Sequence, residues 1–262
     1  RRRPACRNAS PLVPEQFLQN AANTFFNRFQ RLCDRIVFLR QFRCPLRRGW
    51  FRLAARQTGI VLSSPSFREA NDQSFNAITV DSDTSTSDSV YLLATHKADH
   101  QKITDMDSKL GETFYIALKE VMIDLAQQIV KDGEGASKFI TVRVRAAETN
   151  TDARTIAFAI ANSPLVKTAI AGADANWGRI VMAIGKSGAK ADRDRLGISI
   201  GGIVIAQNGQ RKDGYNEAPV AAHMAGDNID ILVDMGLGSG EAVVWTCDLT
   251  HGYIAINADY RS

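Results

Sequence analysis

Near the middle of the chain, an amphipathic pattern predicts a helix followed by a strand. Hydrophobic residues recur at helical spacing from Phe114 to Ile129, and Asp132-Gly133 then supplies residues that end a helix. From Ile140 to Arg145 apolar and polar residues alternate, as in a half-buried strand. Glu134, with a glycine on each side, therefore lies in a short loop, where the glycines let another molecule approach the backbone. The structural alternative is a glycine cap followed by a solvated acid.

From Ser74 onward the pattern predicts alternating helices and strands. A helix capped by Thr151 or Asp152 is expected to run through Ile156 and Ile160, and Ser163-Pro164 ends it. Further helices are expected at 177–184, closed by Gly185, and at 217–224; strands are expected at 166–170, 198–200, 202–206, 229–233, 242–247 and 253–256, with a turn at Asn208-Gly209. Short glycine-rich turns join the closing strands. This order predicts an α/β fold with substantial antiparallel pairing.

Two glycine-containing segments resemble phosphate-binding loops without meeting their requirements. Gly185-Lys186-Ser187 resembles the end of a P-loop, but Ile180 stands where that motif needs its first glycine. The glycines from Gly236 to Gly240 follow a predicted strand and lead into another strand, so no helix N-terminus is available for a pyrophosphate. We interpret this second segment as a hairpin turn.

No metal site is expected. His96 and His100 would share a helix face, but Asp99 stands where the inverted zinc motif has glutamate, and no third ligand is apparent. The oxygen-rich run 81–88 lacks the glycine and the final glutamate of a calcium loop. A network of turn and cap hydrogen bonds is the simplest interpretation of that run.

Composition favours a soluble protein in a reducing compartment. The chain has 262 residues, of which 45% are hydrophobic, and no apolar run approaches the roughly 20 residues that span a bilayer. Its four cysteines are too widely spaced for a zinc ribbon and show no disulfide pattern: Cys6, Cys33, Cys44 and Cys247.

The net charge of +4 conceals two unlike parts. Residues 1–60 hold 13 Arg, no Lys and two acids, Glu15 and Asp34, so this segment carries +11 and the remainder −7. Four interpretations stand: an organellar transit peptide, a nucleic-acid-binding segment, a domain that periodicity does not reveal, or sequence from a shifted frame or faulty start. We favour the last, because natural phosphate-binding faces usually mix both cations.

Six segments follow one another in order across about 190 residues: 74–88 (SFNAITVDSDTSTSD), 132–138 (DGEGASK), 162–172 (NSPLVKTAIAG), 174–179 (DANWGR), 245–250 (WTCDLT) and 256–262 (INADYRS). Together they resemble one family, the glutamate N-acetyltransferases (ornithine acetyltransferases) of arginine biosynthesis. The resemblance implies layered helices with mixed, largely antiparallel sheets. It covers residues 67–262 as a β-chain-like domain and leaves 1–66 as an Arg-rich segment without family resemblance, an artefact or disordered.

The resemblance implies an acyltransferase whose precursor cuts itself into α and β chains. The threonine freed at the start of the β chain takes acetyl from N-acetylornithine and passes it to glutamate, with its own amine as the base. No cofactor is implied, although acetyl-CoA is a substrate of some members, and the oxyanion hole lies in the α chain. The expected assembly is α2β2, in the cytoplasm or alternatively the mitochondrial matrix. Neither a membrane nor nucleic acid is expected as a partner.

Three residues match the substrate-binding positions of that family: Glu134, Asn257 and Ser262. The carboxylate suits a substrate amine, while the amide and the hydroxyl suit a substrate carboxylate. Lys167 and Arg179 lie in strongly matching segments and are expected to serve the scaffold or to pair charges.

Departures from the family pattern limit the prediction. Nothing in residues 1–73 resembles the nucleophile motif Ala-Thr-Met-Leu, and neither Thr24 nor Thr58 has the right surroundings, so no catalytic residue is identified. Ser82 stands where the family usually has glycine, and it would be strained in a turn that needs positive φ. Ser87 replaces Asn, and Ser137 replaces Thr and keeps a hydroxyl. The alternative is an inactive truncated or frame-disrupted relative, at most a ligand-binding module.

Overall fold

The computed structural model describes residues 37–40, 64–84, 88–93 and 103–259. The chain divides into two compact units, one made of residues 1–64 and 85–117 and the other of residues 65–84 and 118–262. In the first unit β1 (Val37–Arg40) pairs antiparallel with β2 (Val90–Leu93), and Val37 lies opposite Leu93. The boundary that we expect between residues 66 and 67 stays a prediction.

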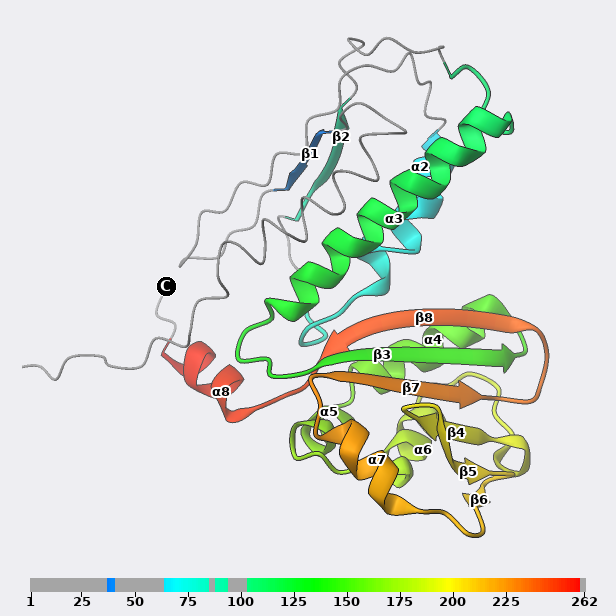
Figure 1. Cartoon of the computed structure of the whole chain (residues 1–262), viewed down its shortest axis with the longest axis vertical. Coiled ribbons are helices and arrows are strands. Elements are labelled where there is room, and N and C mark those ends of the chain that lie inside the picture. The colour runs from blue at the N-terminus through cyan, green and yellow to red at the C-terminus, as the bar shows by residue number, and fades with distance from the viewer. Residues whose placement is uncertain (1–36, 41–63, 85–87, 94–102, 260–262) are drawn as a thin grey trace, which may run out of the picture. The chain divides into compact units, whose positions relative to one another are not determined.

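The second unit is built on a six-stranded mixed sheet (Figure 1), as the sequence predicts. Its strand order is β6-β5-β4-β7-β3-β8. The strands are β3 (Phe139–Ala147), β4 (Gly197–Ile200), β5 (Ile203–Gln207), β6 (Gln210–Arg211), β7 (Asn228–Asp234) and β8 (Gly240–Cys247). Only β3 and β7 pair in parallel within this sheet, and the other neighbours are antiparallel.

The glycine-rich segment between β7 and β8 does not form the hairpin that we expect, because β3 lies between the two strands. The segment instead passes over the end of β3. A Cβ at Gly238 would lie 2.7 Å from the carbonyl oxygen of Ala147, and one at Gly240 would lie 2.2 Å from that of Thr149. Glycine is therefore needed here for a close backbone crossing.

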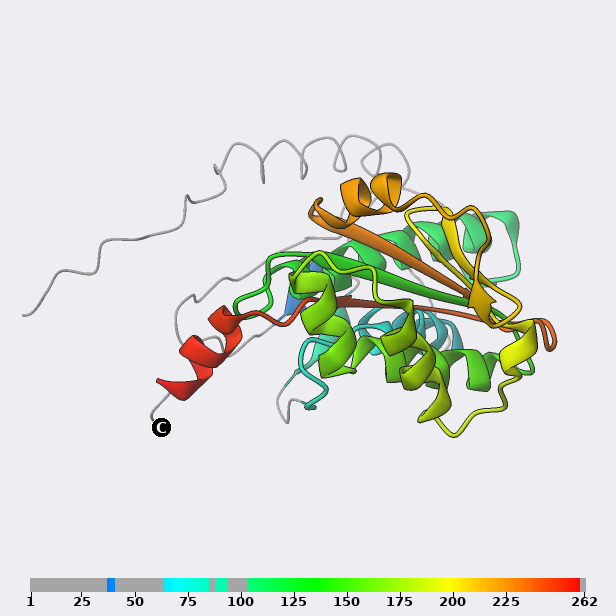
Figure 2. The same ribbon diagram turned by 90° about the horizontal axis from the view of Figure 1, so that it is seen from below.

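Three helices cover one face of the sheet (Figure 2): α4 (Asn150–Ala161), α5 (Pro164–Ala171) and α6 (Trp177–Gly185). Ile156 and Ile160 of α4 are fully buried against inward-facing strand residues such as Val142 and Ile231. Helix α7 (Glu217–Met224) adds Val220 and Met224 to the same core. This cluster excludes most of its apolar surface from water, which is the main stabilising contribution.

A smaller cluster lies on the opposite face of β3 and β8. It contains Val130 near the end of α3 (Lys109–Lys131), Ala77 in η1 (Phe75–Ala77), and Trp245 and Cys247 of β8. Neighbouring β8 residues alternate between the two faces, because side chains alternate along a strand. Outside the sheet, α2 (Ser64–Asp72) precedes η1, and the Ser74 hydroxyl donates to the carbonyl of Ala70 at 2.6 Å.

Helix α3 and the loop after it agree with the expected pattern, whereas two of the predicted strands are helices. Residues 166–170 belong to α5, which begins at Pro164, and residues 253–256 belong to α8 (His251–Ala258). Proline is favoured in the first helical turn, and the Thr250 side chain caps α8 by accepting from the Gly252 N–H at 3.0 Å.

The predicted N-cap residue of α4 is also wrong, because the helix begins two or three positions earlier than expected. Thr149, and not Thr151 or Asp152, is the N-cap residue, and its side chain accepts from the Asp152 N–H at 3.1 Å. Within the described part of the chain, no helix is both long and apolar enough to cross a membrane. The cellular compartment stays a prediction.

Candidate functional site

The Glu134 loop, residues 132–138, connects α3 to β3 and lies against the start of α8. Gly135 adopts a φ of +68°, and a Cβ there would lie 2.3 Å from the Tyr253 nitrogen. A side chain would therefore be strained by its backbone and would also clash with α8. The close approach that the two glycines predict is made by this chain's own helix.

Glu134 and Asn257 meet at this junction. The Asn257 side-chain amide donates to Glu134 Oε2 at 2.8 Å and to the carbonyl oxygen of Tyr253 at 3.0 Å. Both Glu134 and Asn257 are exposed to solvent. The structure thus brings together two of the three residues that we predict to bind substrate, while the third, Ser262, lies outside the described residues.

A second polar pair joins Tyr253 of α8 to Asp81 in the turn after η1. The Tyr253 hydroxyl donates to Asp81 Oδ2 at 2.9 Å. Burial, the hydrogen bond to Asp81 and the charges of Asp81, Glu134 and Asp83 together raise the pKa of Tyr253 to about 12. The side of α8 that carries Tyr253 and Asn257 therefore faces negative potential.

The segment that contains Asp81 is the turn network that its composition predicts. Asp81 Oδ1 accepts from the Asp83 N–H at 3.0 Å, and the Thr79 hydroxyl donates to Asn162 Oδ1 at 2.7 Å. Ser82 has a φ of +79°, so the strain expected for a serine at this position is present. Asp81 and Tyr253 were not among our predicted site residues, because neither position stands out until the fold brings α8 to this turn.

Asp248 holds the Glu134 loop in place from the end of β8. Its carboxylate accepts from the Ser137 N–H at 2.8 Å, the Ser137 hydroxyl at 2.5 Å and the Lys138 N–H at 2.9 Å. Only 3% of Asp248 is exposed. The hydroxyl that Ser137 retains in place of the family's threonine thus has a structural partner.

Thr250 makes a further link between the same two segments. Its hydroxyl donates to the carbonyl oxygen of Gly135 at 2.6 Å while the same oxygen caps α8. The sequence gives no direct signal for Asp248 and Thr250 as partners of the loop, since 110 or more positions separate them from it.

Lys167 and Arg179 contact backbone and side-chain oxygens, as the scaffold role predicts. Lys167 is buried, and its ammonium donates to Thr246 Oγ1 at 2.8 Å and to the carbonyl oxygen of Cys247. Burial lowers the pKa of Lys167, while the nearby acidic groups raise it in partial opposition. The Arg179 guanidinium donates to the carbonyl oxygen of Leu165 at 2.7 Å.

Glu134 and Asp81 both keep capacity for a cationic ligand. Among the residues that the structure describes, no ion pair joins either carboxylate to a lysine or an arginine. Within the same residues no group of three or more His, Cys, Asp and Glu side chains could hold a metal ion, and His96 and His100 lie outside them. Each carboxylate accepts hydrogen bonds from neutral groups, so each can pair with an organic ammonium group.

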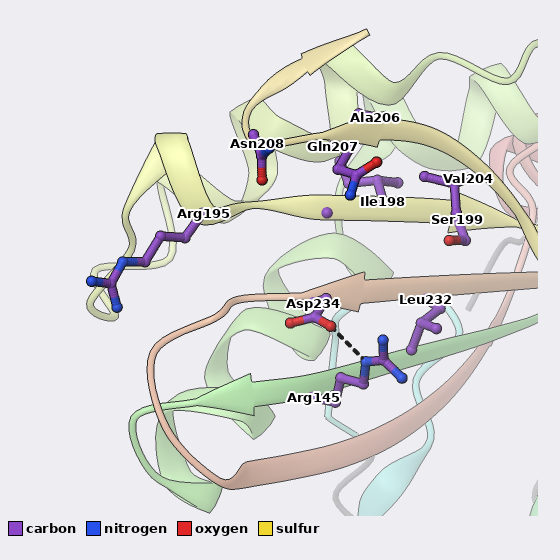
Figure 3. A pocket seen from close by; sticks show the side chains of 11 residues that line it. Arg145, Arg195, Ile198, Ser199, Val204, Ala206, Gln207, Asn208, Leu232 and Asp234 are labelled. Carbon is purple, nitrogen blue, oxygen red and sulfur yellow. Dashed lines mark hydrogen bonds and ion pairs between the residues drawn. The ribbon is translucent and has the colours of Figure 1, made fainter. Parts of the chain in front are cut away.

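A pocket of about 280 Å³ lies elsewhere, on β4, β5 and β7 (Figure 3). Arg145, at its edge, is six residues along β3 from Phe139, so roughly 20 Å of strand separates it from the Glu134 loop. Arg145 pairs with Asp234 at 2.8 Å (Figure 3). Arg195 donates to the carbonyl oxygen of Gly236 at 3.1 Å. Since both guanidinium groups already have partners, this pocket is a weaker candidate than the α8 junction.

Curated bacterial proteins share more than half of their matched residues with this chain. A protein of Zymomonas mobilis is 58% identical over 194 residues, which are 74% of this chain and 47% of that protein. A protein of Gluconobacter oxydans is 57% identical over 190 residues, 72% of this chain and 45% of that protein. Both are named arginine biosynthesis bifunctional protein ArgJ. The chain therefore spans about half the length of the curated relatives it matches.

A solved structure and a family model agree with these relatives. The crystal structure of the arginine biosynthesis bifunctional protein ArgJ from Bacillus halodurans matches with a TM-score of 0.74 and 39% identity, over 78% of this chain and 97% of that chain. The model of the ArgJ family matches residues 60–262. This chain belongs to the ArgJ family.

Proposed function

We propose that this chain supplies one wall of an acetyl-transfer site, which moves acetyl from N-acetyl-L-ornithine to L-glutamate in arginine biosynthesis. The observation that carries the proposal is the 2.8 Å hydrogen bond between Asn257 and Glu134, which are 123 positions apart. Both residues match family substrate positions, and membership of the ArgJ family supports the same reaction.

The two side chains have complementary roles in this proposal. The Glu134 carboxylate accepts the ammonium group that each amino-acid substrate carries, in a charge-assisted hydrogen bond. The Asn257 amide, which in the free protein donates to Glu134, can then donate to the substrate carboxylate. Ser262, four positions beyond α8, is proposed to donate its hydroxyl to the same carboxylate.

The reaction itself needs a nucleophile that this sequence does not contain in recognisable form. In the proposed first step a threonine hydroxyl attacks the acetyl carbonyl of N-acetylornithine, its proton passes to the leaving nitrogen, and ornithine departs. In the second step the amine of glutamate attacks the acetyl ester and the threonine regains its proton. No cofactor takes part, although acetyl-CoA could replace N-acetylornithine as donor with a thiol as leaving group.

A partner chain is proposed to supply the nucleophile's surroundings and the oxyanion hole. This chain covers 97% of the solved Bacillus chain but only 47% of the Zymomonas protein, so that solved chain is about half as long as the curated relatives. Such lengths suit a protein that acts as two different chains. We propose an α-type partner that corresponds to the unmatched half, in an α2β2 assembly.

One observation favours a second candidate, a module that binds ornithine or glutamate without transferring acetyl. The motif Ala-Thr-Met-Leu does not occur in the sequence. In this case Glu134 and Asn257 would still bind an amino acid, because their contact does not depend on the nucleophile.

The two candidates are separated by mixing the chain with the N-terminal half of the Zymomonas protein and supplying N-acetylornithine with a labelled acetyl group. Transfer of label to glutamate, or to a threonine of either chain, supports acetyl transfer. Binding of N-acetylornithine by calorimetry without any transfer supports the binding module. If the mixture shows no binding and no transfer, both candidates are contradicted. The Zymomonas half alone is the control.

A further inference from the structure

Lys167 ties the end of β8 to α5 from two directions. Its side-chain ammonium donates to Thr246 Oγ1 and to the carbonyl oxygen of Cys247, and its own carbonyl oxygen accepts from the Leu249 N–H at 3.4 Å. The residues between these contacts, 246–249, are therefore held at both ends by one residue.

A buried lysine is a costly way to fill space. Only 3% of Lys167 is exposed, and taking an ammonium out of water is unfavourable unless acceptors and opposite charges compensate. Here two oxygen acceptors do so, and Asp248 and Asp81 supply opposite charge. An apolar side chain of similar length would fill the same volume without the desolvation cost, so the directional bonds are what the lysine adds.

The same segment holds the Glu134 loop. Asp248 accepts three hydrogen bonds from Ser137 and Lys138, and Thr250 donates to the carbonyl oxygen of Gly135. Glu134 directly precedes the first of these attachment points, Gly135. The covalent and hydrogen-bonded path thus runs from Lys167 through residues 246–250 to the residues that directly follow Glu134.

We propose that Lys167 is a positioning residue of this site, which fixes the segment 246–250 so that Asp248 and Thr250 hold the Glu134 loop against α8. The relevance to catalysis rests on the proposed function, because it requires that Glu134 binds substrate. The mechanical part of the proposal concerns only contacts within this chain.

Amide hydrogen exchange measured by NMR on the full chain tests the mechanical part. Lys167→Met removes the ammonium and keeps the length of the side chain. We expect exchange at the Ser137 and Lys138 amides to accelerate about tenfold, while the amides of Val142 and Val144 in β3 change less than about threefold. Ile205→Val and Ile205→Ala, in the remote buried strand β5, are controls that bracket the loss of melting temperature.

Two outcomes would overturn the proposal. If exchange accelerates equally at Ser137, Lys138 and the β3 amides, Lys167 stabilises the whole fold and does not position the loop. If exchange at Ser137 and Lys138 is unchanged, Lys167 does not hold these residues through the segment 246–250. If Lys167→Met does not fold, Thr246→Val removes one acceptor of the ammonium at nearly constant volume. Acceleration confined to the same two amides is again expected, and its absence is contrary to the proposal.

The affinity for N-acetylornithine tests whether the position of the Glu134 loop matters for substrate binding. In Lys167→Met we expect the Kd for N-acetylornithine, measured by calorimetry in the presence of the Zymomonas half, to rise about tenfold, with no change in Ile205→Val. An unchanged Kd together with accelerated exchange would overturn the role at the site. If the wild-type chain binds no N-acetylornithine, the proposed function fails, and the exchange experiment still decides whether Lys167 positions the loop.

Discussion

Asn257 is oriented toward Glu134 by its own helix. One side-chain amide nitrogen donates both to Glu134 Oε2 and to the carbonyl oxygen of Tyr253, one turn earlier in α8. The second bond fixes the rotamer of Asn257, so the amide points at the carboxylate before any ligand arrives. Preorganisation of this kind lowers the entropy that binding must otherwise offset.

Replacing Glu134 by glutamine should weaken substrate binding without unfolding the protein. Glutamine keeps an oxygen that can accept from Asn257 but loses the charge that an ammonium group needs. We expect the Kd for N-acetylornithine, measured by calorimetry, to rise about tenfold to a hundredfold, and Glu134→Ala to weaken it at least as much. The melting temperature should change little, since an exposed loop acid contributes little to the core.

Glu241→Gln is the matched control for this prediction, because Glu241 is an exposed acid at the other end of β8. The Kd of Glu241→Gln for N-acetylornithine should equal that of the wild type. A large loss of melting temperature in Glu134→Gln with unchanged affinity would assign Glu134 a structural role.

Replacing Gly135 by alanine should destabilise the protein and disturb α8. The new Cβ would lie 2.3 Å from the Tyr253 nitrogen and would also occupy a positive-φ position. We expect a loss of about 2 kcal/mol or more in the free energy of unfolding by urea, together with weaker substrate binding. Gly188→Ala is the control, since Gly188 also has positive φ but has open space around it, and it should cost about 1 kcal/mol. Equal losses in the two variants would show that contact with α8 is unimportant.

The Tyr253 hydroxyl should ionise at a higher pH than that of an ordinary tyrosine. Its folded pKa of about 12 lies above the usual value of 10, so the folded state holds the phenolic proton more tightly than the unfolded state. The resulting stability is fully present below pH 10 and is lost as the pH rises from 10 to about 12. Absorbance at the phenolate band, titrated in wild type and Tyr253→Phe, isolates this group by difference.

Asp81→Asn provides the complementary measurement. The hydrogen bond and charge of Asp81 both favour the protonated hydroxyl, so the difference titration should move toward pH 10 in this variant. A difference curve that is centred at the ordinary tyrosine pKa already in the wild type would refute the contact.

Ser82→Gly should stabilise the protein. Serine at a φ of +79° is strained, and glycine adopts this conformation without that cost. After the greater entropy of glycine in the unfolded chain is allowed for, we expect a gain of about 0.5–1 kcal/mol in the free energy of unfolding. Ser82→Ala keeps the strain and should give no gain. A lower melting temperature for Ser82→Gly would mean that the serine side chain makes a stabilising contact.

Local sequence patterns are enough to predict the elements whose periodicity is long or whose ends carry clear start and stop residues. Helix α3 and strand β3 follow from periodicity, and the loop that carries Glu134 follows from the glycines between them. The predicted strands at 166–170 and 253–256 are wrong because short apolar runs do not distinguish a strand from a helix, and the start signals at Pro164 and Thr250 decide in favour of helix.

Contacts between residues far apart in the sequence follow from the fold and not from local patterns. Placement of β3 between β7 and β8 is a long-range pairing that the local glycine pattern cannot specify. The contact of Asn257 with Glu134 and the bonds of Asp248 to the loop join positions more than 100 residues apart. Such contacts depend on how helices and strands pack together, whereas periodicity reports only which face of each element is apolar.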